Sequence, residues 1–214
     1  MGFGSDLGFA LRVIIAPGKN AKKALTVGSA LKIYYEASIV PLLFAIFIGV
    51  LLLDAGIQNI TVPLIGSFAV FGMQAALALA IIISMWVLVP IGLFINAFFY
   101  QIIGKRVFNA WNGAYEKTFA ASMFGVLPQT MLYWLLAIPI LNIIALAIIF
   151  VWNFIVLIIG LAVQQKTSRV NAFVAILATV ISVMAIAMIL IFAATTLYML
   201  PATVPAGSGT LHPI

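Results

Sequence analysis

Five long apolar stretches follow one another along the chain, separated by short polar or charged segments. They cover roughly residues 37–53, 55–104, 119–138, 142–163 and 172–197. A helix needs about 20 apolar residues to cross the hydrocarbon core of a bilayer. A membrane β-barrel would instead require alternating segments of about ten residues, and the sequence does not contain them. The pattern therefore predicts an all-α fold, an integral membrane helical bundle of about five transmembrane helices.

The second stretch is long enough for either one extended crossing or two, and the distribution of charge favours one. Lys105, Arg106 and Lys117 follow this stretch, and a single crossing returns them to the side of the N-terminal lysines. All ten lysine and arginine residues then lie on one face. The positive-inside rule makes that face cytoplasmic, with the N-terminus inside and the C-terminus outside. The extra length predicts a tilted helix kinked at Pro90, with its outer part near Gly66 along the interface.

The membrane domain is expected to span residues 34–199, between a basic, amphipathic, cytoplasmic N-terminal segment (1–33) and a flexible exterior tail (200–214). The N-terminal segment contains a short apolar helix that ends at Pro17. This helix is expected either to lie in the plane of the interface or to pack on the bundle. Tyr34 and Tyr35 are expected to anchor the first span at the interface.

Composition supports a membrane protein and excludes a soluble domain. Hydrophobic residues make up 66% of the chain, charged residues 7%, and the mean hydropathy is +1.31. A soluble domain carries about 45–50% apolar and about 25% charged residues. The net charge of +6 lies beside the apolar spans, where anionic headgroups attract it. Membrane lipids are therefore the expected partners of the basic face, and nucleic acid is not.

Few residues are suited to catalysis. The acidic residues Asp6, Glu36, Asp54 and Glu116 fall at span ends or in loops, so a proton relay in mid-membrane is not expected. The single histidine, His212, lies in the tail and the chain has no cysteine. We therefore expect no enzyme activity, no cofactor and no metal site.

Neutral polar and small residues within the spans are the candidates for helix packing. Asn153 is the deepest of the polar ones, and an unpaired amide there would cost several kcal/mol in hydrocarbon, so it needs a partner. Small residues recur at every fourth position in the second span, which lets another helix approach closely, either from the same bundle or from a second subunit. The candidate packing residues are Gly72, Ala76, Ala80, Ser84, Asn96, Gln129 and Asn153.

A second group of candidates forms the cytoplasmic face. Aromatic residues there alternate with basic ones, which is typical of an interfacial aromatic belt and also fits a docking face for a cytosolic protein. The candidates are Lys105, Arg106, Trp111, Tyr115, Lys166 and Arg169.

The C-terminal half of the chain resembles the Yip domain family, five-span membrane proteins that associate with Ypt/Rab GTPases. The matching positions are Thr118, Phe119, Pro128, Trp152, Gly160, Leu161, Ser168 and Ala172, with a weaker match at residues 15–17 and 24–25. The resemblance covers roughly residues 11–192 and implies a helical bundle with a cytosolic N-terminus. The trafficking members carry a long cytosolic region with an acidic, aromatic motif that ends in Gly-Pro, which this chain lacks. A short prokaryotic member of the cell membrane fits better, and GTPase binding is not expected to transfer.

Two functions remain open from sequence. The first is a non-enzymatic membrane scaffold or adaptor, including a subunit of a larger complex with membrane or cytosolic protein partners. The alternative is a transporter or channel for a small neutral or lipid-like solute, with Asn96, Gln129 and Asn153 along its path. Direct pairing of these amides with the backbone would favour the scaffold, and a solvent-reachable cavity joining them would favour the transporter.

Overall fold

The computed structural model describes residues 3–57, 80, 84–137 and 141–199, and all regular elements in these ranges are helices. This confirms the predicted all-α class. The elements are α1 (Phe3–Ile15), α2 (Pro17–Asn20), α3 (Val27–Ile57), η1 (Ser84–Leu88), α5 (Val89–Ile102), η2 (Ile103–Val107), α6 (Tyr115–Leu132), η3 (Tyr133–Ala137), α7 (Leu141–Gln164) and α8 (Arg169–Met199).

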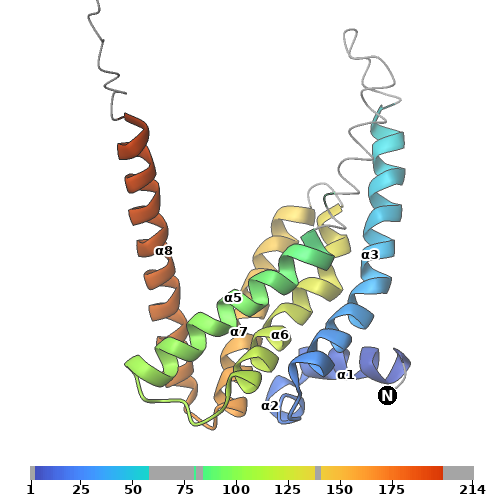
Figure 1. Cartoon of the computed structure of the whole chain (residues 1–214). Coiled ribbons are helices and arrows are strands. Elements are labelled where there is room, and N and C mark those ends of the chain that lie inside the picture. The colour runs from blue at the N-terminus through green and yellow to red at the C-terminus, as the bar shows by residue number, and fades with distance from the viewer. Residues whose placement is uncertain (1–2, 58–79, 81–83, 138–140, 200–214) are drawn as a thin grey trace, which may run out of the picture.

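The long helices run alternately up and down (Figure 1). α3, α6 and α8 point in one direction, α5 and α7 point in the other, and α1 lies across the base. Four segments of the described chain are long and apolar enough to cross a membrane: Val27–Phe44, Ser84–Val107, Ile143–Gln164 and Arg169–Thr196. The chain is thus a helical membrane protein. The predicted third span corresponds to α6 and η3, and it is not among these four.

α6 forms the centre of the bundle. Eleven of its 18 residues are buried, and it packs mainly against α7. Two glycines bring these helices together. A Cβ at Gly125 would lie 2.9 Å from the Cβ of Leu157, and one at Gly160 would lie 3.4 Å from the carbonyl oxygen of Ala121. Small residues allow this approach, and close packing is a main source of stability between membrane helices.

α1 packs on the bundle, which is one of the two alternatives expected for the N-terminal segment. The rings of Phe9 and Phe124 meet edge to face with centroids 6.0 Å apart. The indole N–H of Trp152 donates to the carbonyl of Ile14 at 3.2 Å. On its other side α1 exposes Phe3, Leu11 and Ile15, which are apolar and suited to the boundary between headgroups and acyl chains.

A π-helical turn, η1, precedes Pro90, at the place where the sequence predicts a kink. Proline has no N–H, so it cannot bond the carbonyls four and five residues earlier, those of Trp86 and Met85. The Tyr34 hydroxyl donates to the Met85 carbonyl, and the Tyr35 hydroxyl donates to the Trp86 carbonyl. Tyr34 is fully buried, so its prediction as an interfacial anchor is wrong; its hydroxyl instead serves the irregular turn.

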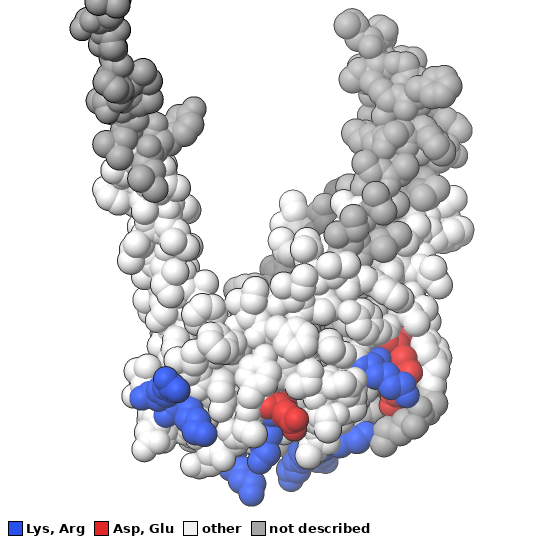
Figure 2. All heavy atoms as spheres, in the orientation of Figure 1, with Lys and Arg blue, Asp and Glu red and all other residues white. Residues whose placement is uncertain are grey.

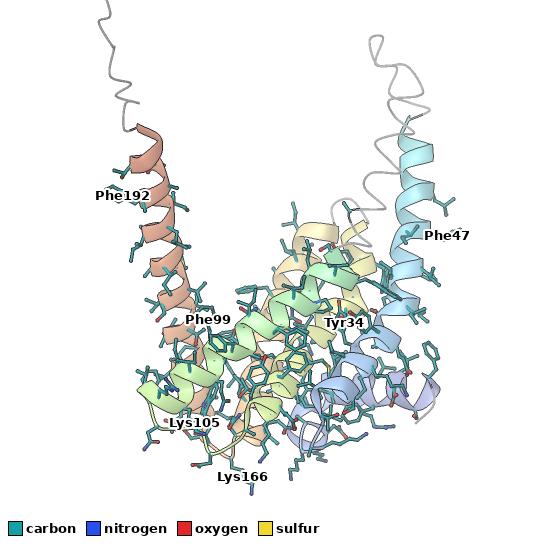
Figure 3. The ribbon with its side chains drawn as sticks, in the orientation of Figure 1. Tyr34, Phe47, Phe99, Lys105, Lys166 and Phe192 are labelled. Carbon is teal, nitrogen blue, oxygen red and sulfur yellow. The ribbon has the colours of Figure 1, made fainter. Side chains whose placement is uncertain are left out.

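Among the described residues, α8 is buried against the bundle only near its beginning. Its buried residues are Ala172, Ala175, Ile176 and Thr179. From residue 180 to residue 196 its side chains are exposed or half-exposed. Figure 1 shows α8 and the end of α3 projecting away from the central helices. Figure 3 shows Phe192 on α8 and Phe47 on α3, both directed outward.

Candidate functional site

A buried polar cluster joins α5, the turn before α6, α6 itself and the end of α7. The Gln165 amide nitrogen donates to the Thr118 hydroxyl at 2.6 Å, and its amide oxygen accepts from the Gly113 N–H at 2.7 Å. Thr118 donates to the side-chain oxygen of Gln101, whose amide nitrogen donates to the Gly113 carbonyl at 3.0 Å. Gln165 and Thr118 have no exposed surface. The cluster is therefore a closed set of hydrogen bonds that holds four segments together.

The neighbouring Gln164 links the N-terminal segment to the same end of α7. Its amide nitrogen donates to the carbonyls of Ala21 and Lys23, at 2.5 and 2.8 Å. Sequence reasoning named neither Gln164 nor Gln165 as a site residue. The available signal was two adjacent amides at the end of a long apolar span, immediately before Lys166.

Asn153 on α7 pairs with Gln129 on α6. The Asn153 side-chain oxygen accepts from the backbone N–H of Gln129 at 3.0 Å, and its amide nitrogen donates to the Gln129 side-chain oxygen at 3.3 Å. Such pairing of an amide with the backbone favours a role in helix packing over a role in lining a solute path. The structure thus brings together two of the three amides proposed to line a path.

A surface hollow of about 100 Å³ lies beside this pair, lined also by Leu146, Ile149 and Phe150. Asn96, the third amide, is exposed on α5 and does not line the hollow. This hollow therefore joins Gln129 and Asn153 but not Asn96.

Half of the predicted small-residue surface falls outside the described residues. Gly72 and Ala76 lie outside them, Ala80 is exposed, and Ser84 is half-buried at the start of η1. The close approach of helices that the structure does describe is at Gly125 and Gly160.

The cationic end of the molecule contains most of the residues predicted for the cytoplasmic face. Figure 2 shows lysine and arginine side chains gathered along the base, away from the projecting ends of α3 and α8. Lys105, Arg106, Lys166 and Arg169 are all exposed, and Figure 3 places Lys105 and Lys166 at this end. The prediction that Trp111 belongs to this exposed face is wrong. Trp111 is 2% exposed because its indole covers Gly104, which has no side chain to keep it away.

Tyr115 occupies an intermediate position. It is half-buried, its ring packs against Phe119, and its hydroxyl donates to the Phe94 carbonyl at 3.1 Å. Both aromatic candidates thus make internal contacts, whereas the four basic candidates are exposed.

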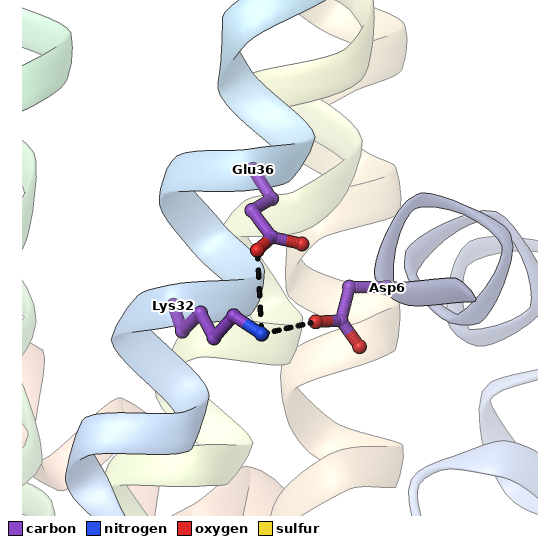
Figure 4. A network of polar contacts seen from close by, with 3 residues as sticks. All are labelled: Asp6, Lys32 and Glu36. Atoms are coloured by element: carbon purple, nitrogen blue, oxygen red, sulfur yellow. Dashed lines mark ion pairs between the residues drawn. The ribbon is translucent and has the colours of Figure 1, made fainter. Parts of the chain in front are cut away.

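A charged group between α1 and α3 was not singled out from sequence. The Lys32 ammonium lies 3.4 Å from a carboxylate oxygen of Asp6 and 3.4 Å from one of Glu36 (Figure 4). The Asp6 side chain is 3% exposed. The second oxygens, Asp6 Oδ1 and Glu36 Oε2, are buried and have no hydrogen-bond partner among the described residues. A sequence signal existed for one half of the group, because Lys32 and Glu36 are four residues apart on one helix face.

The arrangement offers hydrogen bonds and charge but no reactive constellation. Within the described residues no group of three or more His, Asp or Glu side chains could hold a metal ion. No protein-family model matches the chain, and searches of curated proteins and of solved structures find no match either. The resemblance to the Yip domain family therefore stays a prediction.

Proposed function

We propose that this protein is a non-enzymatic scaffold or adaptor of the membrane that holds partner proteins through its transmembrane helices and its basic face. The observation that carries the proposal is the pairing of Asn153 with Gln129. The side-chain oxygen of Asn153, the deepest polar side chain, accepts a hydrogen bond from a backbone N–H of the neighbouring helix. That is the expected use of an amide that sets the register of two helices, for which about 1 kcal/mol is typical.

The buried cluster around Gln165 supports the same proposal. Its amides and hydroxyl bond to one another and to Gly113, so none of these groups is directed at a solute. Closely packed central helices and an α8 that packs on them only by its first turns suit a protein that positions others. The outer half of α8 offers a surface that a partner helix can reach, because among the described residues none buries it.

The exposed basic residues supply the second surface. Lys105 and Arg106 precede the turn into α6, and Lys166 and Arg169 surround the turn into α8. At the level of the headgroups such residues are attracted to anionic lipid, by about 1 kcal/mol each. They would orient the scaffold with this face in the cytoplasm. The cell membrane is the proposed location.

Site-specific photo-crosslinking in intact membranes tests the proposal. A photoreactive residue at Phe192 on the outer half of α8 should give one discrete protein adduct, recovered at stoichiometric yield. The matched position is Phe124, which is fully buried in α6 and should give none. Adducts with lipid alone at Phe192 and at other exposed α8 positions would contradict a scaffold built on α8.

The hollow beside Gln129 and Asn153 is the observation that favours the alternative, a transporter or channel for a small neutral or lipid-like solute. A cysteine in place of Asn153 separates the two functions, since the natural chain has no cysteine to interfere. The scaffold requires this thiol to stay unreactive toward a water-soluble maleimide. Rapid modification that a candidate solute blocks would favour the transporter.

A further inference from the structure

Gln129 carries an unused amide nitrogen at the surface of α6 and α7, which run side by side in opposite directions (Figure 1). The backbone N–H of Gln129 can only donate, so the Asn153 atom that faces it is the side-chain oxygen. The Asn153 amide nitrogen then donates to Gln129 Oε1. Among the described residues Gln129 Nε2 has no hydrogen-bond partner, and it is not one of the fully enclosed polar atoms. Two N–H donors therefore stay available on a half-buried residue that lines the hollow.

This amide lies near the middle of the membrane. Asn153, its partner, stands near the midpoint of the apolar segment Ile143–Gln164, whose length suits a hydrocarbon core of about 30 Å. Headgroups and ester carbonyls lie at the two surfaces of that core, and acyl chains contain no acceptor. Unpaired N–H groups are costly in hydrocarbon, so the surface calls for a neighbour that brings an acceptor to this depth.

The hollow beside Gln129 has the size of a single side chain. Its volume is about 100 Å³, and Leu146, Ile149 and Phe150 of α7 complete its lining with Asn153. Pockets for small molecules are typically about 300–1,000 Å³. Ile149 is buried, whereas Leu146 and Phe150 are exposed and stand at the rim. The hollow is thus suited to a side chain from a neighbouring helix.

The same face of α7 carries projecting side chains. Ile143, Leu146 and Phe150 follow helical spacing with Asn153, and they are 75%, 59% and 72% exposed. Exposed apolar side chains are ordinary in lipid and by themselves identify no partner. Here, however, a projecting Phe150 lies on one surface with a hollow that contains an unused amide. A surface with both a projection and a hollow meets the requirement of an interface between two identical copies.

The Gln129 amide is also complementary to itself. Oε1 accepts one hydrogen bond from Asn153 and keeps a second lone pair, while Nε2 keeps its donors. Two such amides that face each other form a reciprocal pair, in which each nitrogen donates to the oxygen of the other. Copies with the same orientation in the membrane hold Gln129 at the same depth. A twofold axis along the membrane normal therefore brings the two amides together without a change in depth.

We propose that this surface of α6 and α7 binds a second copy of the chain. The two α7 helices meet across the twofold axis, the Gln129 amides form the reciprocal pair, and Phe150 of each copy occupies the hollow of the other. The proposed scaffold function uses α8, so either proposal can fail without the other.

Disulfide crosslinking of single cysteines in native membranes tests the interface, because the chain has no cysteine of its own. Copies with Leu146→Cys or Phe150→Cys should crosslink into a dimer, since residues beside the axis come within reach of a disulfide. Ile148→Cys and Val151→Cys are the matched controls. These residues are 57% and 55% exposed on the opposite face of α7 and should not crosslink. Equal crosslinking on both faces, or an adduct with a different protein at residue 146, would overturn the proposal.

The dissociation constant of the dimer assigns the contacts. It is measured in liposomes by energy transfer between copies labelled at Asn112→Cys, an exposed position. Q129M removes both bonds of the reciprocal pair and should raise the constant about tenfold, which corresponds to about 1.4 kcal/mol. F150A should weaken the dimer by a similar factor. F192A is the matched control, because Phe192 is 74% exposed on α8, and it should dimerise as the unaltered chain does.

If Q129M fails to fold, F150A and the crosslinking pattern still decide the outcome, because Phe150 is exposed. A chain that stays monomeric at every concentration, unchanged dimerisation in Q129M, or equal weakening in F150A and F192A would each reject the proposal. Protection of Leu146→Cys by a small polar solute in a monomeric chain would assign the hollow to transport instead.

Discussion

The hydroxyl of Tyr35 donates a hydrogen bond of 3.1 Å to the backbone carbonyl of Trp86, 51 positions away in the sequence. The bond is needed because Pro90, four residues after Trp86, has no N–H to offer that carbonyl. A tyrosine of α3 thus supplies the hydrogen bond that the helix containing Pro90 cannot make. The same bond fixes the position of the two segments relative to each other.

This relationship predicts a coupling between Tyr35 and Pro90. Tyr35→Phe should lower the free energy of unfolding by about 1–2 kcal/mol, because it leaves the Trp86 carbonyl without its partner. Pro90→Ala restores a backbone N–H, so in that background the same substitution should cost less than about 0.5 kcal/mol. A double-mutant cycle from chemical unfolding in detergent measures the difference. Additive effects would show that the tyrosine hydroxyl does not replace the hydrogen bond that is missing at Pro90.

The cluster around Gln165 predicts a large effect from one neutral substitution. Gln165→Leu removes the partner of the Gly113 N–H and one of the two partners of the Thr118 hydroxyl, which keeps its bond to Gln101, inside a fully buried site. We expect a loss of about 1–3 kcal/mol, the cost of one abandoned buried group. Thermal unfolding in detergent provides the measurement. Asn171→Ala, at an exposed position of α8, is the control and should change stability by less than about 0.5 kcal/mol.

Lys166 predicts a substitution that stabilises the protein. Its φ of 53° lies in the left-handed region, where it ends α7 and lets the Thr167 N–H bond the Ala162 carbonyl at 3.0 Å. Glycine adopts this conformation without strain from a Cβ, so Lys166→Gly should add about 0.5–1 kcal/mol. Asn109, with φ 47°, is the comparison. Asparagine tolerates this region, so Asn109→Gly should gain less. An equal or larger gain at residue 109 would reject this account of Lys166.

The all-α class could be predicted from the sequence, because hydropathy reports directly on segments that lipid will accept. Sequence reasoning failed where a residue's environment depends on a distant segment. Trp111 was expected at the surface because it stands among basic residues, but it is buried because Gly104 leaves room for its ring. Tyr34 was expected at the interface, but the carbonyl of Met85 holds it inside.

The partner that Asn153 needs could be anticipated because the need rests on a local physical cost. A deep amide must find a partner in hydrocarbon, and it does so in Gln129. Hydropathy also does not predict the ion pairs of Lys32 with Asp6 and Glu36. Asp6 belongs to α1, and only the packing of α1 on the bundle brings it to α3.

The predicted orientation in the membrane can be tested by labelling one introduced cysteine per molecule. The chain has no cysteine, so a single introduced thiol reports its own side. Cysteines in place of Ser5 and Asn112, both exposed at the cationic end of the fold, should react only from the cytoplasm. A cysteine in place of Ser208, which lies outside the described residues, should react only from the exterior. Labelling of residues 5 and 112 from opposite sides would reject the five-span topology.

Three glycines in helices give a graded prediction about the central pair α6 and α7. Gly125→Ala places a Cβ 2.9 Å from the Cβ and 3.3 Å from the Cα of Leu157, so the helices must move apart. The expected loss is about 1–3 kcal/mol from overpacking. At Gly160 the nearest atom is the Ala121 carbonyl oxygen at 3.4 Å, a contact that a small shift relieves, so Gly160→Ala should cost less.

Gly92 on α5 is the matched control, because a Cβ there would meet no atom within 4 Å. Gly92→Ala should be neutral or stabilise the protein by up to about 1 kcal/mol, the difference in helix propensity between the two residues. Thermal unfolding of all three variants in one detergent should therefore rank them in the order Gly92→Ala, Gly160→Ala, Gly125→Ala, from most to least stable. If Gly125→Ala were as stable as Gly92→Ala, α6 and α7 would not be in close contact at this glycine. The Asn153–Gln129 pair, which joins the same two helices one turn further along α6, would then lose the packing that brings its groups within hydrogen-bond distance.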